Sequence, residues 1–127
     1  MIDYENEIFS AVASAVREKF PGAYVVGTEL ISTPPNFPAV AIVQSNNSAR
    51  TEYSTFESLE NVVREDYKVE VYSNLITGKE AQTKAMTTVI SDVFAEFGYG
   101  RTFCEVVANG DSTINRRISR FTKNNVI

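Results

Sequence analysis

Hydrophobic and polar residues alternate from Tyr67 to Tyr72, which is the pattern of a strand that buries one face and exposes the other. The apolar face holds Tyr67, Val69 and Val71, and the opposite face holds Lys68, Glu70 and Tyr72. The predicted strand runs from about Asn61 to Ser73, so Arg64 and Asp66 continue the charged face. We expect this charged face to meet water or a partner.

Two other segments carry apolar residues at every third or fourth position, and this spacing predicts two amphipathic helices. The first helix is expected from about Asp3 to Phe20, where Pro21 and Gly22 end it. The second is expected from Gly78 to Phe97. Its apolar stripe consists of Ala81, Ala85, Met86, Val89, Ile90, Val93, Phe94 and Phe97.

Both ends of the second helix carry capping signals. Thr77 and Glu80 have the spacing of a capping box, in which each side chain bonds a backbone amide at the helix start. Gly98 follows the last apolar residue and is expected to close the helix in a left-handed conformation. The chain from Tyr67 to Gly98 therefore predicts a strand, a turn and a capped helix.

The remaining strands are predicted from β-branched and aromatic residues and from turn signals. The expected segments are Ala23 to Ile31, Ala39 to Val43, Thr102 to Ala108 and Thr113 to Thr122, with Asn109, Gly110 and Asp111 turning the last two into a hairpin. Ala39 to Val43 has no polar alternation, which favours a central strand covered on both faces.

Two connections stand out. Residues 32–38 contain three prolines around Phe37 and are expected to stay outside any strand ladder. Gln44 to Glu60 is polar and lacks periodicity, so we expect a long loop there, and long loops are commonly functional. As partner-facing loop residues we predict Phe37, Arg50, Glu52 and Tyr53.

The predicted element order is α-β-β-β-α-β-β. Strands linked mainly by hairpins predict a largely antiparallel sheet, and two amphipathic helices are expected to pack on one of its faces. The 127 residues suit one domain, so residues 1–127 are predicted to form a single α+β domain. No apolar run approaches the roughly 20 residues that cross a bilayer, so no membrane partner is expected.

The chain offers little for catalysis. It has no histidine, so the commonest general base and metal ligand is missing, and its glycines do not form a phosphate-binding loop. The single cysteine, Cys104, lies in a predicted strand and is better explained as a small buried hydrophobe than as a reactive thiol. We therefore expect no enzyme activity, no catalytic or metal site and no cofactor.

Positive charge gathers near the carboxyl terminus of a chain whose net charge is −4. The cluster consists of Arg116, Arg117, Arg120 and Lys123. Strand alternation places Arg116 and Arg120 on one face and Arg117 on the other. Three interpretations are open: charges that discourage unwanted edge pairing, a subunit interface, or a surface near phosphate groups.

The order of elements, together with several short segments, resembles the tail-terminator (tail-completion, "minor capsid") proteins of tailed phages that infect Gram-positive bacteria. The segments are residues 69–74, residues 77–79, the helix end at residues 97–99 and the closing strand at residues 113–117. The resemblance implies a hexameric ring that caps the tail tube, stops its growth and faces the head connector. It also implies a place in the virion tail or neck after assembly in the bacterial cytoplasm.

In such a ring the partners are other copies of the chain, the tail-tube protein and the head-connector protein, while DNA passes nearby without specific binding. The subunit interface is predicted to use Arg64, Lys68, Glu70, Arg116, Arg117 and Arg120, with acidic patches of one copy facing arginines of the next. Two alternatives are a head-side connector or stopper protein of the neck and, further off, a nucleic-acid-binding module that uses the arginine cluster.

Overall fold

The computed structural model describes residues 5–30, 34–49, 62–108 and 111–126 of the chain. These residues form two helices, α1 (Glu5–Lys19) and α2 (Lys79–Glu96). They also form the strands β1 (Tyr24–Val26), β2 (Ala39–Ala49), β3 (Val62–Ser73), β4 (Gly100–Val107) and β5 (Asn115–Val126). The predicted order α-β-β-β-α-β-β and the α+β class are both confirmed.

The strands make one sheet in the order β1-β2-β3-β5-β4. β3 is antiparallel to both of its neighbours, and β4 is antiparallel to β5. The short strand β1 is parallel to β2, so the sheet is largely but not wholly antiparallel. This order places β1 and β4 at the two edges and β3 at the centre.

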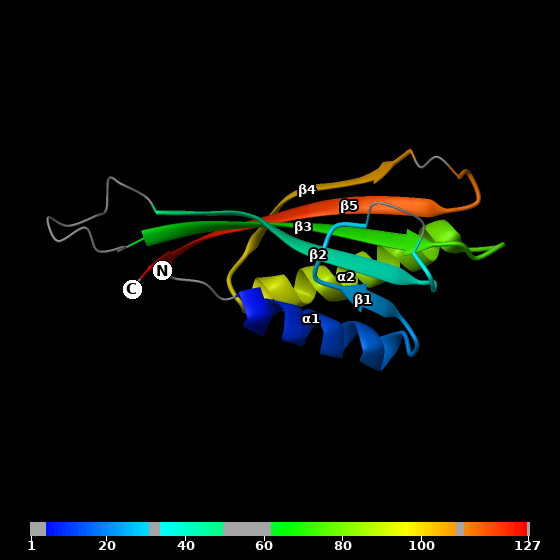
Figure 1. The fold of residues 1–127 in the computed structure, drawn as a ribbon, viewed down its shortest axis with the longest axis horizontal. Helices are drawn as coiled ribbons and strands as arrows, with labels where there is room; N and C mark the ends of the chain where they lie inside the picture. Colours follow the sequence, from blue (N-terminus) through cyan, green and yellow to red (C-terminus); the bar gives the residue numbers. More distant parts are fainter. Residues whose placement is uncertain (1–4, 31–33, 50–61, 109–110, 127) are drawn as a thin grey trace, which may run out of the picture.

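Both helices pack on the same face of the sheet, as the sequence predicts (Figure 1). The apolar face of β3 supplies Tyr67, Val69 and Val71 to the core. The helices cover these side chains with Ile8, Val12 and Val16 from α1 and Met86, Ile90 and Phe94 from α2. We call the opposite surface of the sheet the helix-free face.

Four aromatic rings form the centre of this core. Phe94 stacks on Phe121 with ring centroids 4.2 Å apart, and it meets Tyr99 edge-on at 5.4 Å. Tyr67 contacts both Phe94 and Tyr99 at 5.5 Å. The four rings come from β3, α2, β5 and the segment just before β4, so they join α2 to two strands and to the residue that precedes a third.

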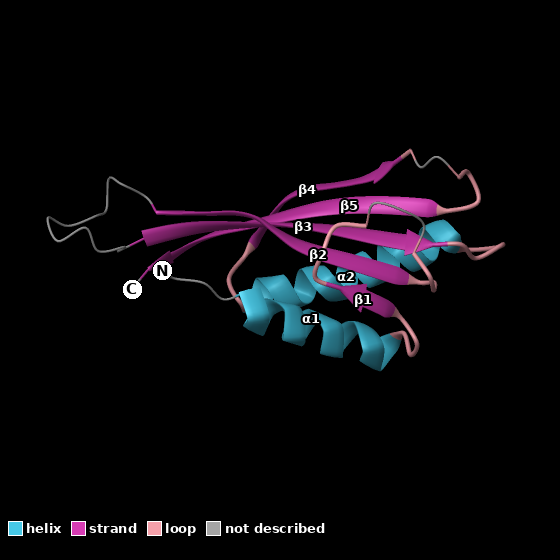
Figure 2. Cartoon of the chain, in the orientation of Figure 1, coloured by secondary structure: helices cyan, strands magenta, loops and turns pink. Residues whose placement is uncertain are grey.

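The sheet extends beyond the helices as a three-stranded arm, formed by residues 44–49 of β2, 62–66 of β3 and 122–126 of β5 (Figure 2). The prediction of a loop starting at Gln44 is therefore wrong for residues 44–49, which continue β2 past an irregularity at Ser45. The missing alternation has a physical reason. The described side chains on both faces of the arm are polar, so no apolar periodicity marks it.

Residues 27–30 and 34–38, between β1 and β2, cross to the helix-free face instead of continuing as a strand, and we call them the crossing loop. The predicted strand from Ala23 to Ile31 shrinks to β1, because pairing with β2 ends at Val26. Leu30 and Phe37 then pack against Tyr72 and Ile114 on the helix-free face. This loop brings Glu29 over β3, which the sequence gives no reason to expect.

The capping-box prediction at the start of α2 is wrong. Gly78 occupies the cap position with φ 87° and makes no side-chain hydrogen bond, so Thr77 stands one residue too early to cap the helix. At the other end, Gly98 has φ 86° and confirms the left-handed stop. The predicted stripe is also shifted at its first turns. Ala81 and Ala85 are exposed, whereas Thr83 and Thr87 are buried against the sheet.

Strand ends also differ from expectation. β4 begins at Gly100 and β5 at Asn115, and β5 continues to Val126 as part of the arm. Of the predicted turn, Asn109 and Gly110 lie outside the described residues. Cys104 is half-buried, because β4 is an edge strand that the helices barely cover.

The aromatic centre gives the first prediction. Phe94→Ala is expected to lower the free energy of unfolding by about 3–5 kcal/mol, because it removes a fully buried ring and leaves a cavity. Urea unfolding measures the change. The control is Val106→Ala on β4, where the side chain is 46% exposed and the loss should stay below about 1 kcal/mol. Equal losses in the two variants would contradict the assignment of the core.

Candidate functional site

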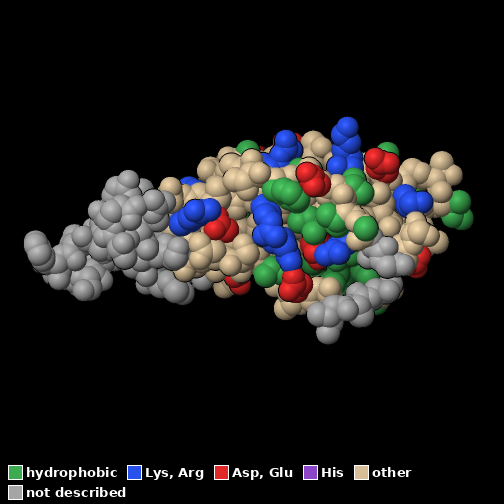
Figure 3. All heavy atoms as spheres, turned by 90° about the horizontal axis from the view of Figure 1, so that it is seen from above, with side chains coloured by type: hydrophobic (Ala, Val, Ile, Leu, Met, Phe, Trp, Pro, Cys, Tyr) green, Lys and Arg blue, Asp and Glu red, His purple; other side chains and the backbone are tan. Residues whose placement is uncertain are grey.

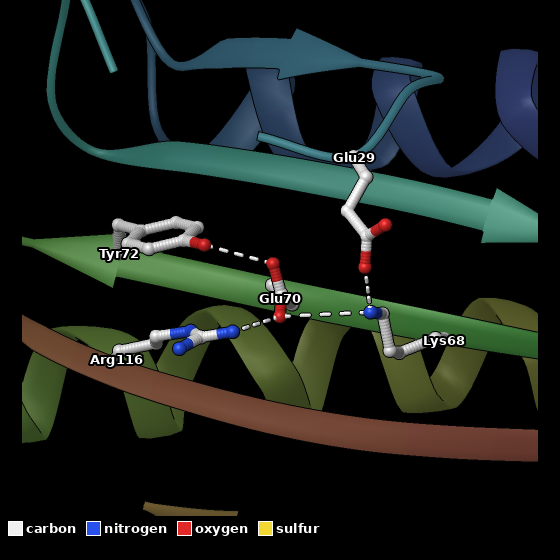
Figure 4. A network of polar contacts seen from close by, with 5 residues as sticks. All are labelled: Glu29, Lys68, Glu70, Tyr72 and Arg116. Carbon is white, nitrogen blue, oxygen red and sulfur yellow. Dashed lines mark hydrogen bonds and ion pairs between the residues drawn. The ribbon is translucent and has the colours of Figure 1, made fainter. Parts of the chain in front are cut away.

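Glu70 lies at the middle of the helix-free face, yet it is only 1% exposed. Its carboxylate accepts a hydrogen bond from the Tyr72 hydroxyl at 2.8 Å and another from the Arg116 guanidinium. The Lys68 ammonium lies 3.9 Å away on the other side (Figure 4). Burial of a carboxylate is costly unless opposite charges and hydrogen-bond donors surround it, and Glu70 has both.

The strand period explains how these groups meet. Lys68, Glu70 and Tyr72 occupy alternate positions of β3 and therefore point to the same face. Arg116 sits directly across from Tyr72 on β5, and its guanidinium lies 5.9 Å from the Tyr72 ring centroid. The hydrogen bond to Glu70 raises the pKa of Arg116, so this cation is permanent.

Glu29 reaches the network from the loop after β1. Its carboxylate accepts a hydrogen bond from Lys68, and this contact lowers the pKa of Glu29. The Glu29 side chain remains 57% exposed, so water screens the pair and the tether on the loop is weak. The five-residue network of Glu29, Lys68, Glu70, Tyr72 and Arg116 contains two carboxylates and two cations, whose charges cancel.

Arg120 adds positive charge beside this balanced network. It lies directly opposite Lys68 in the pairing of β3 with β5, so both point to the helix-free face. Like charges in directly opposite positions of a sheet are destabilising. Arg120 is exposed, and within the described part of the chain no carboxylate forms an ion pair with it. Arg120 therefore adds an exposed cation to the helix-free face, where Figure 3 shows Lys and Arg side chains together with Asp and Glu side chains.

The other predicted interface residues lie apart from the network. Arg64 is on the arm and pairs with Asp66 at 3.2 Å. Arg117 points to the helix side, where its Nε donates to the Thr83 hydroxyl at 3.5 Å. The structure thus brings Lys68, Glu70, Arg116 and Arg120 to one area and separates Arg64 and Arg117 from it.

Of the four predicted partner-facing loop residues, the structure describes only Phe37. Phe37 is partly buried against the cluster of Ala39, Tyr72 and Ile114, so it holds the crossing loop on the helix-free face. Arg50, Glu52 and Tyr53 lie outside the described residues.

A second buried carboxylate, Glu65, was missed by the sequence reasoning. It is fully buried where the arm joins the body, and it accepts hydrogen bonds from the Tyr99 hydroxyl at 2.8 Å and the Gln44 amide at 3.0 Å. Gln44 also donates to the Tyr67 hydroxyl at 3.2 Å, and burial raises the pKa of Tyr67. Tyr67 and Glu65 are two residues apart in β3, so the same alternation that places Tyr67 on the helix side also places Glu65 there. The sequence pattern could therefore have predicted that Glu65 is buried.

The described residues contain no group of three or more Cys, Asp or Glu side chains placed to hold a metal ion. No helix among them has the length and apolarity needed to cross a membrane. Neither the models of known protein families nor curated protein sequences gave a match to this chain. The family suggested by the sequence therefore stays a prediction.

The network gives a stability prediction at Glu70. Glu70→Gln is expected to lower the free energy of unfolding by about 2–4 kcal/mol, because it leaves Arg116 and Lys68 without their shared counter-charge. Urea unfolding is again the measurement. Glu29→Gln is the matched control. It should lower the free energy of unfolding much less, because the ion pair of Glu29 with Lys68 is exposed to water. A larger loss at Glu29 than at Glu70 would overturn this description of the network.

A pH prediction follows from Tyr72. Burial and the hydrogen bond to Glu70 raise the pKa of Tyr72 to about 12. Between pH 10 and about 12 the unfolded chain has released this proton while the folded protein still holds it, so stability falls as pH rises.

Unfolding in urea at a series of alkaline pH values tests this prediction. Tyr72→Phe is expected to make the fall between pH 10 and about 12 shallower. Part of the fall should remain, because Tyr67 also has a raised pKa. An identical slope in the wild type and in Tyr72→Phe would show that Tyr72 is not held as described.

Proposed function

We propose that this protein is a structural subunit that caps a phage tail tube, associating with copies of itself into a ring and joining the tail to the head connector. The proposal is supported by the ordered segments that resemble tail-terminator proteins and by the α+β fold that accommodates them. The activity is binding by shape and charge, without a chemical reaction.

The observation that carries the proposal is the apposition of Lys68 and Arg120 on the helix-free face. A monomer gains nothing from placing two cations directly opposite each other, and local conflicts of this kind concentrate at functional surfaces. Lys68 is partly neutralised by Glu29, whereas Arg120 has no carboxylate partner among the described residues. A partner that brings a carboxylate to Arg120 would remove the conflict.

A second copy of the chain can supply that carboxylate. Glu7 and Glu18 are exposed on α1, and α1 lies on the other side of the sheet from the helix-free face that carries Arg120. Contact between the helix layer of one copy and the helix-free face of the next is heterologous, because two different surfaces meet. Heterologous contacts produce closed rings when the rotation between neighbours closes.

Arg116 is less suitable for this contact than the sequence suggests. Its guanidinium is engaged by Glu70 of the same chain. Reversing its charge would place a second carboxylate beside the buried Glu70, which would damage the fold rather than report on assembly.

The test is therefore Arg120→Glu, measured by native mass and by electron microscopy of the protein alone and mixed with tail-tube protein. Self-association is expected to weaken by about tenfold or more, while the free energy of unfolding stays the same or rises slightly as the conflict with Lys68 is relieved. The wild type is expected to form rings that bind tube ends.

Arg101→Glu is the control, because it makes the same charge change at an exposed arginine of β4, the edge strand that lies away from α1. It should leave self-association unchanged. Equal weakening in both variants would mean that net charge, not the contact at Arg120, controls assembly. A wild-type monomer that binds DNA with a steep salt dependence would favour the nucleic-acid-binding alternative.

A further inference from the structure

The turn between β3 and α2 lies at one end of the molecule (Figure 1). We call residues 74–78 the tip. Ile76 is 100% exposed and Leu75 is 44% exposed. Large exposed apolar side chains that lie together commonly mark a contact surface.

The base of the tip is held in place. Ser73 is fully buried and its hydroxyl donates to the Gln82 side chain of α2, while the Leu75 amide donates to the same hydroxyl at 3.4 Å. Gly78 enters α2 with a left-handed backbone, and the Gln82 amide donates to its carbonyl. A tip fixed in this way loses little conformational freedom on binding, which favours its use as an anchor.

A pocket on the helix side offers a matching surface. It has a volume of about 230 Å³ and is lined by Phe9, Ile42 and Gly27, with Glu5 and Asn6 of α1 also lining it. Phe9 and Ile42 make it apolar, and Gly27 leaves it open because it has no side chain. It lies by the first turn of α1, away from the tip along the molecule.

The charges around the two surfaces are complementary. Lys79, Glu80 and Lys84 line the same shallow hollow as Ile76, so positive charge is in excess there. Glu5 lines the pocket, and the first turn of α1 also carries Glu7. An apolar anchor with a basic surround fits an apolar pocket with an acidic border.

We propose that Ile76 at the tip of one copy inserts into the Phe9, Gly27 and Ile42 pocket of a second copy. The inference rests on the self-association in the proposed function and names a contact for it. The tip and the pocket are different surfaces of one chain, so their contact is heterologous and each copy can both give and receive an anchor.

Cysteine cross-linking tests the contact directly. In a Cys104→Ser background, which removes the only native thiol, the double variant Ile76→Cys with Asn6→Cys is expected to form a covalent ladder of dimers, trimers and higher species under mild oxidation. Ile76→Cys and Asn6→Cys as separate proteins should cross-link when mixed and not when alone. Dimers from Ile76→Cys alone, without a ladder in the double variant, would overturn the proposal.

Filling the pocket provides an independent test. Gly27 does not have a left-handed backbone, and an added Cβ would meet the Phe9 ring at 3.5 Å, which is an ordinary contact. Gly27→Leu should therefore fold, yet weaken self-association by about tenfold or more. Gly100→Leu is the control. An added Cβ at Gly100 would meet no atom within 4 Å, and this variant should leave association unchanged.

The outcomes separate this inference from the proposed function. Rings that persist unchanged in folded Gly27→Leu would overturn the tip contact and leave the ring proposal standing. A wild-type protein that stays monomeric at every concentration and with tube protein would overturn both. Weakened association in Gly27→Leu together with the mixed cross-link would support the contact.

Discussion

Strand β3 is the constraint on which the rest of the structure depends. It pairs with β2 along one side and with β5 along the other for nearly its whole length, so both neighbours take their register from it. Its alternation sends Tyr67, Val69 and Val71 under the helices and turns Lys68, Glu70 and Tyr72 to the helix-free face. A shift of one residue in the register of β3 would turn Lys68, Glu70 and Tyr72 into the apolar core. Burying charged groups there is energetically unfavourable, so only one register is stable.

The sequence predicts those features that depend on local periodicity. The element order, the two helices and the phase of β3 follow from spacing, which puts Lys68 and Glu70 on one face of their strand and Arg116 and Arg120 on one face of theirs. The pairing of β3 with β5 is what brings the two pairs to the same face of the sheet. Features that depend on tertiary pairing were not predictable. The crossing loop that carries Glu29, the length of β2 and the shift of the buried stripe to Thr83 and Thr87 all arise from packing against distant elements.

The two faces of the sheet handle charge differently. Glu65 on the helix side is buried among hydroxyl and amide donors, whereas Glu70 on the helix-free face is held by cations. Both arrangements satisfy a carboxylate within its own chain, so neither is a free binding group. Two exposed features are left that a partner could bind: the Arg120 guanidinium and the apolar side chain of Ile76 at the tip. They lie on different parts of the surface.

The arm has a further consequence for how stability is distributed. Its described side chains are polar on both faces, so burial of apolar area contributes little to its order. Backbone ladders and side-chain bonds such as Asn46 to Asp66 must hold it together. We therefore expect the arm to open at a smaller free energy than the aromatic centre, so amides in the arm should exchange with solvent faster than amides in the body.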